Sequence, residues 1–242
     1  MRIAAVLGGA GGIGSAIVEQ MLAAGDFVHV LDREDRRTRV AALLEAWPQR
    51  CAFIGCDLAC PDAIAMAFAR IEAQGMGLDA CINAAGVIHR GRFVEVAPKA
   101  LGEMLTVNVS GVFQALQAAT RLMLAKGCGR IVIVASAHGL RTTAERSAYA
   151  MCKGAMLALS RALAVELGPH GILVNAVAPG PVSAGMQDAA SESRRRWQAA
   201  TPLGRVADAE EVARAVAFLA SAENTFITGD TLMVDGGANV SL

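Results

Sequence analysis

Two residues with proton-transfer chemistry lie four positions apart, Tyr149 and Lys153, in the run Ser147-Ala-Tyr-Ala-Met-Cys-Lys-Gly. On a helix this spacing puts both side chains on one face, one turn apart. A free tyrosine has a pKa of about 10, and a lysine ammonium one turn away favours the phenolate and lowers that pKa. The pair therefore predicts a general acid or base near neutral pH. Because an exposed helix face often carries the same pair, the rest of the chain must decide.

The segments that must position this pair are short apolar strands alternating with helices. Strands are predicted at residues 2–7, 27–31, 51–55, 78–82, 130–134, 172–177 and 231–234. Helices are predicted at residues 15–24, 34–46, 61–74, 101–126, 147–167 and 208–220. This alternation predicts an α/β fold, a doubly wound parallel sheet with helices on both faces. There is no linker, repeat or low-complexity segment. Only the charged segment 191–197 is expected to lie outside the core.

Glycines and polar side chains mark the ends of the predicted strands. The loop Gly8–Gly14 follows the first strand and opens a helix, where the backbone can approach a pyrophosphate. Asp32 follows 20 residues after Gly12, where a carboxylate can bind the adenosine ribose hydroxyls or cap a helix. The other strand ends carry Asp57, Asn83, Ser136 and Pro179-Gly180. Ligands of parallel sheets bind at this edge, so the pattern predicts a dinucleotide site.

Composition excludes several classes of function for this chain. The chain has 242 residues, 54% of them hydrophobic, which is enough for one large core. The 22 basic and 22 acidic residues balance, so neither nucleic acid nor a membrane surface is expected as a partner. The apolar runs look too short to span a bilayer, and a cytoplasmic protein without a signal peptide is expected. Six scattered cysteines without a Cys-x-x-Cys motif predict reduced thiols and no metal site.

Together these motifs resemble the short-chain dehydrogenase/reductase family over the whole chain. The residues that carry the resemblance are the Gly8…Gly12-Ile13-Gly14 loop, Asp57-Leu58, Asn83-Ala84-Ala85-Gly86, Asn108, Ser136, Tyr149-x-x-x-Lys153, Pro179-Gly180-Pro181-Val182 and Asp235-Gly236-Gly237. The resemblance implies one Rossmann-fold dehydrogenase domain over residues 1–242. Two positions depart from the family pattern, because Leu7 and Ser183 stand where threonine is usual.

The resemblance also implies a role for each matching residue. Tyr149 is the acid or base, Lys153 lowers its pKa and holds the nicotinamide ribose, and Ser136 stabilises charge on the substrate oxygen. Asn108 kinks its helix and anchors a water in a proton relay. The cofactor-binding residues are Gly8, Gly11, Gly12, Ile13, Gly14, Asp32, Asp57, Leu58, Asn83, Ala84, Ala85, Gly86, Tyr149, Lys153, Pro179, Gly180, Val182 and Ser183.

The substrate is much less constrained than the chemistry. Pocket walls are expected at residues 88–93 and 137–142, with a lid at about 183–201. Arg90, Arg92 and Arg141 can bind a carboxylate or lie in solvent, and His138 can touch substrate or simply pack. The run Arg194-Arg-Arg196 fits the polar face of a lid helix better than a phosphate site.

Three functions follow from this sequence. The first is an NAD-linked oxidoreductase for a secondary alcohol or ketone, including a cyclic alcohol or diol. The second is an NADPH-dependent 3-oxoacyl-thioester reductase, and the third is a non-catalytic dinucleotide-binding sensor. Asp32 favours NAD over NADP because its charge opposes the 2′-phosphate, whereas Arg33, with Arg36 and Arg37, points to NADP. A homotetramer is implied by the family, and the helices at 101–126 and 147–167 are apolar on more than one face.

Overall fold

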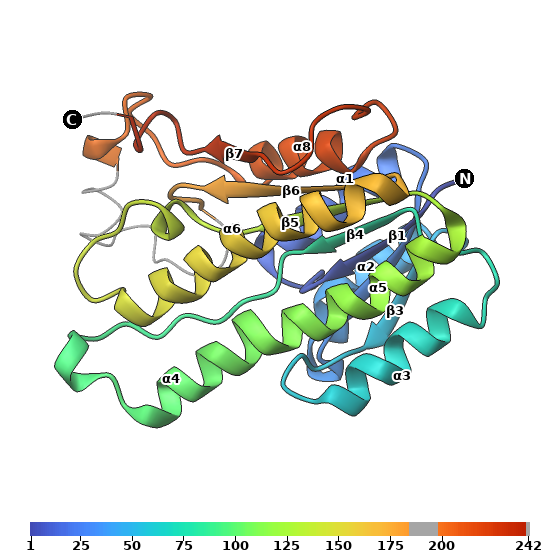
Figure 1. Cartoon of the computed structure of the whole chain (residues 1–242), viewed down its shortest axis with the longest axis horizontal. Coiled ribbons are helices and arrows are strands. Elements are labelled where there is room, and N and C mark those ends of the chain that lie inside the picture. Colours follow the sequence, from blue (N-terminus) through green and yellow to red (C-terminus); the bar gives the residue numbers. More distant parts are fainter. Residues whose placement is uncertain (184–197, 241–242) are drawn as a thin grey trace.

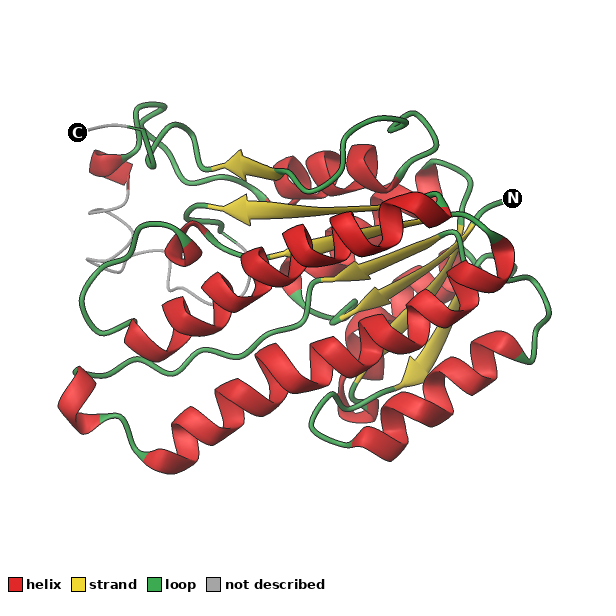
Figure 2. Ribbon diagram, in the orientation of Figure 1, coloured by secondary structure: helices red, strands yellow, loops and turns green. Residues whose placement is uncertain are grey.

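Seven parallel strands form a single sheet in the order β3-β2-β1-β4-β5-β6-β7 (Figure 2). The computed structural model describes residues 1–183 and 198–240. The predicted strands are confirmed, with boundaries that shift by at most two residues. The strands are β1 Ile3–Leu7, β2 Phe27–Asp32, β3 Cys51–Gly55, β4 Ala80–Asn83, β5 Gly129–Val134, β6 Ile172–Pro179 and β7 Thr231–Val234.

Helices cover both faces of this sheet, as the alternation of elements predicts (Figure 1). Three helices pack on one face: α3 Pro61–Glu72, α5 Val112–Lys126 and α6 Ser147–Leu167. The other face is covered by α1 Gly12–Ala23, α2 Ala41–Ala46 and α8 Ala209–Ala220. The strands β1, β4 and β5 are buried on both sides, which is why they read as continuous apolar runs. The fold class is therefore the doubly wound α/β architecture that the sequence predicts.

Two predicted helices have a different form. Residues Glu34–Val40 form a 3₁₀ helix, and only Ala41–Ala46 continue as α-helix. The long helix predicted at 101–126 begins earlier, as α4 Pro98–Leu105, with proline in its first turn. A π-helical turn, Thr106–Gly111, separates α4 from α5. At Gly111 an added Cβ would lie 2.1 Å from the Leu58 carbonyl oxygen, so the backbones meet too closely for a side chain.

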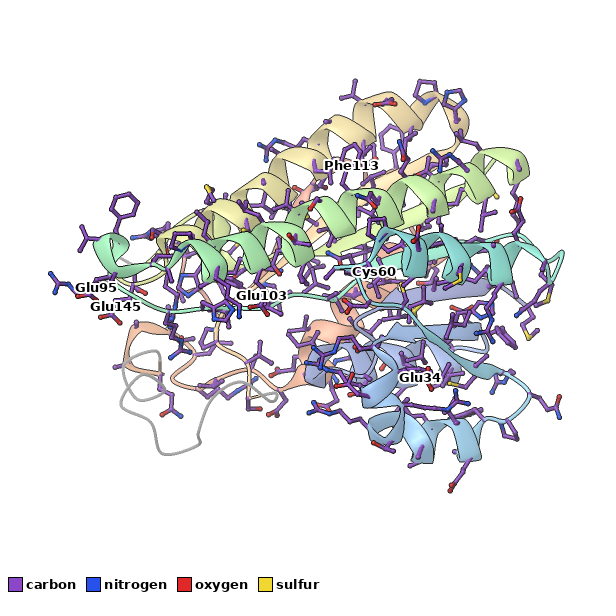
Figure 3. All side chains as sticks on the ribbon, turned by 90° about the horizontal axis from the view of Figure 1, so that it is seen from below. Glu34, Cys60, Glu95, Glu103, Phe113 and Glu145 are labelled. Atoms are coloured by element: carbon purple, nitrogen blue, oxygen red, sulfur yellow. The ribbon has the colours of Figure 1, made fainter. Side chains whose placement is uncertain are left out.

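The helices α5 and α6 are apolar on more than one face, as the sequence indicates. Val112, Leu116, Ala119 and Met156 are buried in the core on the sheet. The large apolar side chains left outside include Phe113, which is 50% exposed on the outer helix layer (Figure 3), and Val165, which is 80% exposed. A surface between copies of the chain would therefore use exposed residues such as Phe113 and Val165.

The helix at residues 147–170 also differs from expectation. By length and hydropathy it qualifies as a membrane-spanning segment, whereas the sequence predicts no apolar run long enough to span a bilayer. Its buried side chains, which include Leu157 and Leu167, pack on the sheet, as those of a core helix do. Its apolar composition is therefore explained by the fold.

The carboxyl ends of the parallel strands gather at one side of the molecule, on the left in Figure 1. The amino-terminal end of α6 reaches the same side (Figure 1), and α1 begins there because the glycine loop joins it to the carboxyl end of β1. Backbone N–H groups at a helix start carry partial positive charge. This side therefore brings together the strand-end residues, the glycine loop and the Tyr149 helix. Most of the predicted lid, residues 184–197, lies outside the described residues, as does Arg194-Arg-Arg196.

Candidate active site

The glycine loop lies against the loop that follows β4. Gly8 adopts the left-handed conformation, with φ of 72°, and an added Cβ there would lie 2.6 Å from the Ala85 Cα. At Gly14 an added Cβ would lie 2.0 Å from the Gly8 carbonyl oxygen. Both positions therefore require glycine. The N-cap of α1 is Gly11, which offers no side-chain hydrogen bond, so the amide groups of this helix start stay open to an anion.

Backbone bonds and Asp32 hold this loop in place of the missing threonine at position 7. The amides of Gly8 and Gly9 both donate to the Leu31 carbonyl oxygen, at 2.8 and 3.3 Å. Asp32 Oδ2 accepts from the Ala10 amide at 3.0 Å, and Oδ1 accepts from the Arg33 amide at 2.9 Å. Leu7 is buried in the core. The loop is thus fixed to β2 by hydrogen bonds that need no side chain from position 7.

The strand ends beyond β1 carry the other predicted cofactor residues. Asp57 Oδ1 accepts from the Ala59 amide at 2.9 Å, a short turn after β3. Asn83 Oδ1 accepts from the Ala85 amide at 3.2 Å and so shapes the loop that faces Gly8. The Asn83 Nδ2 atom is buried and has no partner in the described part of the chain. These two side chains therefore shape the turns over which a ligand would lie.

Asn108 lies in the π-helical turn and joins it to the segment after β4. Its Oδ1 accepts from the Val87 amide at 2.7 Å, and its Nδ2 donates to the Val87 carbonyl oxygen at 2.8 Å. The distortion expected at Asn108 is therefore present, as a π turn. An added Cβ on Gly86 would lie 3.3 Å from Asn108 Oδ1 and 3.5 Å from Lys153 Nζ. Because glycine has no side chain, Gly86 leaves room for these two polar groups.

Ser136, Tyr149 and Lys153 meet beside Gly86. Ser136 Oγ accepts from the His138 amide at 3.2 Å, and the Ser136 hydroxyl lies near enough to the Tyr149 phenol to lower its pKa. Lys153 Nζ donates to the Val134 carbonyl oxygen at 3.0 Å and lies 5.7 Å from the centre of the Tyr149 ring. The His138 ring centroid is 6.1 Å from that of Tyr149. Ser136, Tyr149 and Lys153 therefore lie close together, and Gly86 lies beside both Lys153 and Asn108.

The pKa of Tyr149 differs from the expectation that Lys153 lowers it. Burial raises the pKa of Tyr149, and the hydrogen bond from Ser136 and the charge of Arg146 oppose that rise. Burial also lowers the pKa of Lys153 to about 8. Burial is the largest cause of both shifts, because it disfavours the charged form of each group.

A cleft of about 540 Å³ joins these groups. It runs from Asp32 and the arginines that follow, over the glycine loop, to Tyr149. The predicted residues that line it are Gly8, Gly11, Gly12, Ile13, Gly14, Asp32, Asp57, Leu58, Ala84, Ala85, Gly86, Ser136, Tyr149, Lys153, Pro179, Gly180 and Val182. Asn83 and Asn108 lie behind the wall as buried supports. Ser183 does not line the cleft, and its hydroxyl donates to Asp208 Oδ1 at 3.0 Å.

Arg146 is a cleft residue that the sequence interpretation missed. It occupies the N-cap position of α6 without a side-chain capping bond, three residues before Tyr149, and it is only 7% exposed. The spacing from Tyr149 is a signal that the sequence already contained. Nothing in the sequence marks Arg146 as buried, because its burial depends on the segments around residues 90 and 138.

The three arginines proposed for a substrate carboxylate have different surroundings. Arg90 lines the cleft. Arg92 is exposed and pairs with Glu95 at 3.1 Å, and Arg141 donates to the Asn239 carbonyl oxygen. His138 lines the cleft beside Tyr149, and burial together with the charges of Arg146 and Arg90 lowers its pKa to about 4. No group of three or more His, Cys, Asp or Glu side chains within residues 1–183 and 198–240 is placed to hold a metal ion.

Comparison with known proteins gives a consistent result. Residues 8–239 match a family described as Enoyl-(Acyl carrier protein) reductase. The chain is 34% identical to the 3-oxoacyl-[acyl-carrier-protein] reductase FabG of Salmonella typhimurium, covering 98% of this chain and 96% of that protein. It is 33% identical to L-2,3-butanediol dehydrogenase of Corynebacterium glutamicum, with 98% of each chain covered.

A solved structure with a bound cofactor has the same fold. It is a gluconate 5-dehydrogenase from Burkholderia cenocepacia J2315 in complex with NADP and tartrate. Its TM-score is 0.92 at 28% identity, and the match covers all of this chain and 96% of that one. The fold, the glycine-loop cleft and these matches agree, and the chain belongs to the short-chain dehydrogenase/reductase family of NAD(P)-dependent oxidoreductases.

Proposed function

We propose that this oxidoreductase transfers hydride between NAD(H) and a secondary alcohol or ketone, with Asn108, Ser136, Tyr149 and Lys153 as its catalytic residues. One observation carries the proposal. Ser136 and Tyr149 line the same cleft as the glycine loop, and the Ser136 hydroxyl lies near enough to the phenol of Tyr149 to lower its pKa. A dinucleotide held over that loop would bring its reactive end to this hydroxyl pair.

The side chains supply proton transfer and positioning. In the oxidation direction Tyr149 takes the proton of the substrate hydroxyl, and in reduction it returns that proton. Ser136 donates to the substrate oxygen as negative charge develops there. Lys153, whose Nζ donates to the Val134 carbonyl oxygen, would bind the nicotinamide ribose hydroxyls. Asn108 keeps the segment at Val87 against the π turn and so fixes one wall of the site.

The cleft suits a dinucleotide, which supplies hydride acceptance and donation when it is bound. The open amide groups at the start of α1 would hold the pyrophosphate. Asp32 and Asp57 lie at the adenosine end of the cleft. The buried, unpartnered Nδ2 of Asn83 is a hydrogen-bond donor under the loop at Ala84–Gly86. Pro179–Val182 would face the nicotinamide. Ser183 is proposed as a cofactor-binding residue beside them.

NAD is proposed over NADP because of the charges around Asp32. This carboxylate lines the cleft, where it would repel a 2′-phosphate. Arg33 pairs with Asp35 at 2.6 Å, and Arg36 lies 3.9 Å from Asp32 itself. Each of these guanidinium groups is thus already balanced by a carboxylate.

Two observations favour a second candidate, an NADPH-dependent 3-oxoacyl-thioester reductase. Arg33, Arg36 and Arg39 all line the adenosine end of the cleft. FabG is among the relatives, and a relative of known structure has NADP bound. A non-catalytic sensor is disfavoured, because a sensor has no need for the assembled set of Asn108, Ser136, Tyr149 and Lys153.

The test is a panel of secondary alcohols, diols and 3-oxoacyl thioesters, assayed with each cofactor at the nicotinamide absorbance. Turnover of alcohols with NAD and a higher kcat/KM for NAD than for NADP would support the proposal. Preference for thioesters with NADPH would favour the second candidate. Binding of either cofactor without turnover of any substrate would favour the sensor.

The proposal includes a cytoplasmic homotetramer that needs no metal, nucleic acid or membrane. All six cysteines are free, which suits a reducing compartment. Phe113 and Val165 leave apolar surface on neighbouring outer helices, where copies of the chain can pair. A lid over the nicotinamide end at residues 183–201 completes the proposed single domain of residues 1–242.

A further inference from the structure

Arg146 is a buried cation that no acid balances in the described part of the chain. Its side chain lines the cleft, it is 7% exposed, and its Nε atom has no hydrogen-bond partner. Burial lowers its pKa, and the charge of Arg90 lowers it further. The adjacent Glu145 is exposed and acts on Arg146 more weakly than Arg90 does. Keeping an unpaired guanidinium out of water costs free energy, which a bound anion would recover.

Arg90 faces the same space from another segment. It lines the cleft, and its charge acts on both Arg146 and His138. The Gly91 amide donates to the Glu145 carbonyl oxygen at 3.2 Å, which ties the two arginine-bearing segments together. Figure 3 places Glu145 at the same end of the molecule as Glu95, which lies in that segment. The two cations are therefore held near each other by the backbone.

The acidic residues that line the cleft do not neutralise this pair. Glu103 is engaged by His89, with 2.9 Å between Oε2 and Nε2. Asp32 and Asp57 lie at the ends of β2 and β3, on the other side of the glycine loop from Tyr149. The end of the cleft that holds Tyr149 is therefore positively charged, with Arg90, Arg146 and Lys153 around it.

We infer that this end of the cleft binds a carboxylate of the substrate, held by Arg146 together with Arg90. The inference rests on the proposed function and names its substrate class: a short hydroxy acid, or the corresponding oxo acid. A guanidinium matches the two oxygens of a carboxylate with two parallel hydrogen bonds. Arg146 precedes Tyr149 by three residues, so the bound carboxylate lies close to the carbon that reacts.

The chemistry remains that of the family. During oxidation the O–H proton passes to Tyr149, the C–H bond breaks, and its hydride leaves to the bound NAD. The hydroxy acid becomes an oxo acid, and the carboxylate itself is unchanged. The carboxylate orients the substrate, because the fixed charges of Arg146 and Arg90 favour one direction of approach. A neutral alcohol of the same size leaves both arginines unbalanced and binds less well.

The test compares each acid with its neutral methyl ester: 3-hydroxybutyrate with methyl 3-hydroxybutyrate, and lactate with methyl lactate. The native enzyme is expected to prefer the acids. Arg146→Gln should lower kcat/KM for the acids by about 10- to 100-fold, mainly through KM, and change the esters little. Arg146→Lys keeps the charge but cannot form two parallel hydrogen bonds to a carboxylate. Its kcat/KM for the acids should therefore lie between that of the native enzyme and that of Arg146→Gln. Arg92→Gln, at an exposed arginine paired with Glu95, is the matched control and should behave as native.

Equal turnover of acids and esters by the native enzyme would overturn the inference, as would an equal loss on both in Arg146→Gln. Folding is checked in the same samples. Because Arg146→Gln removes an unbalanced buried charge, its Tm is expected not to fall.

A binding measurement separates this inference from the proposed function. Malonate should raise the Tm of the native protein, whereas the neutral malonamide should not. Arg146→Gln should abolish that rise, and Arg92→Gln should retain it. If no substrate is turned over, the proposed function fails, and the malonate response still decides whether the anion site exists. Absence of the rise in the native protein, or its persistence in Arg146→Gln, would refute the site.

Discussion

The Lys153 ammonium group donates to the Val134 carbonyl oxygen at 3.0 Å while its nitrogen lies 5.7 Å from the centre of the Tyr149 ring. The lysine is thus fixed by the sheet and not by the tyrosine one turn before it. Burial lowers its pKa to about 8 from its usual 10.5. A charged lysine in this position costs stability that a neutral lysine does not.

This cost predicts a pH-dependent stability. Below pH 8 Lys153 is protonated in both folded and unfolded chains, so the full penalty applies. Between about pH 8 and 10.5 the folded state binds fewer protons than the unfolded state, so stability rises with pH. The free energy of unfolding of the native protein should rise relative to that of Lys153→Met, by at most about 1.4 kcal/mol per pH unit. Urea titrations at several pH values measure this difference, and a constant difference would contradict the assigned pKa.

Tyr149→Phe should abolish most turnover without loss of the fold. It removes only the phenolic oxygen and leaves the ring beside His138 in place. Turnover should fall by ~10²–10⁴, the usual contribution of a general acid or base. Steady-state kinetics on a substrate from the panel measures the loss, with NADH fluorescence titration as the binding control. A folded variant that keeps most of its activity would rule out Tyr149 as the proton-transfer group.

Charge at position 32 should set cofactor preference. Like unit charges at ~4 Å cost roughly 4 kcal/mol at an effective dielectric near 20, and half of that is still more than tenfold in binding. The ratio of kcat/KM for NADP to that for NAD should therefore rise at least ~10-fold in Asp32→Asn. Asp32→Ala should shift the ratio similarly but also weaken binding of both cofactors, because Ala10 loses its acceptor. A native preference for NADP, or an unchanged ratio in both variants, would exclude this role for Asp32.

Gly14→Ala should prevent cofactor binding. Its Cβ would lie 2.0 Å from the Gly8 carbonyl oxygen, so the loop must move. Gly102→Ala is the matched control, since its Cβ meets nothing within 4 Å on the exposed side of α4. That control should bind NADH normally and gain up to about 1 kcal/mol from helix propensity. Fluorescence titration and thermal unfolding measure both effects, and normal NADH binding by Gly14→Ala would show that the loop adjusts.

Assembly should depend on Phe113. Light scattering at micromolar concentration should give the mass of four chains, and Phe113→Glu should shift the distribution towards smaller species. Met66→Glu is the comparison, because Met66 is an exposed apolar residue on α3 and not on α5 or α6. A stable native monomer would remove the tetramer from the proposal.

Sequence patterns predicted the strands well because each strand is a short apolar run bounded by glycine or polar residues. Periodicity alone did not predict the π turn at Thr106–Gly111, since helical periodicity continues across it, and only the family resemblance placed a kink at Asn108. The turn depends on contacts with Leu58 and Val87, which are distant in the sequence. The 3₁₀ form of Glu34–Val40 is equally invisible to periodicity.

Type and spacing indicated Tyr149 and Lys153, and the family resemblance added Ser136 and Asn108, but neither predicted the electrostatics of these side chains. Spacing placed Lys153 near Tyr149 but gave no measure of burial, which raises the pKa of Tyr149. Arg146 was missed for the same reason. From the sequence, an arginine beside Glu145 is expected to be a surface residue. Only the structure shows that the segments around residues 90 and 138 bury it.

The hydrogen bond from the Ala10 amide to Asp32 has a consequence for redesign of cofactor use. Specificity and loop architecture share one carboxylate, so the two properties cannot be altered independently at this position. An engineer who wants an NADP-dependent variant must remove the charge yet retain an acceptor for Ala10. Asparagine meets both requirements, and alanine, the usual first choice, meets only one.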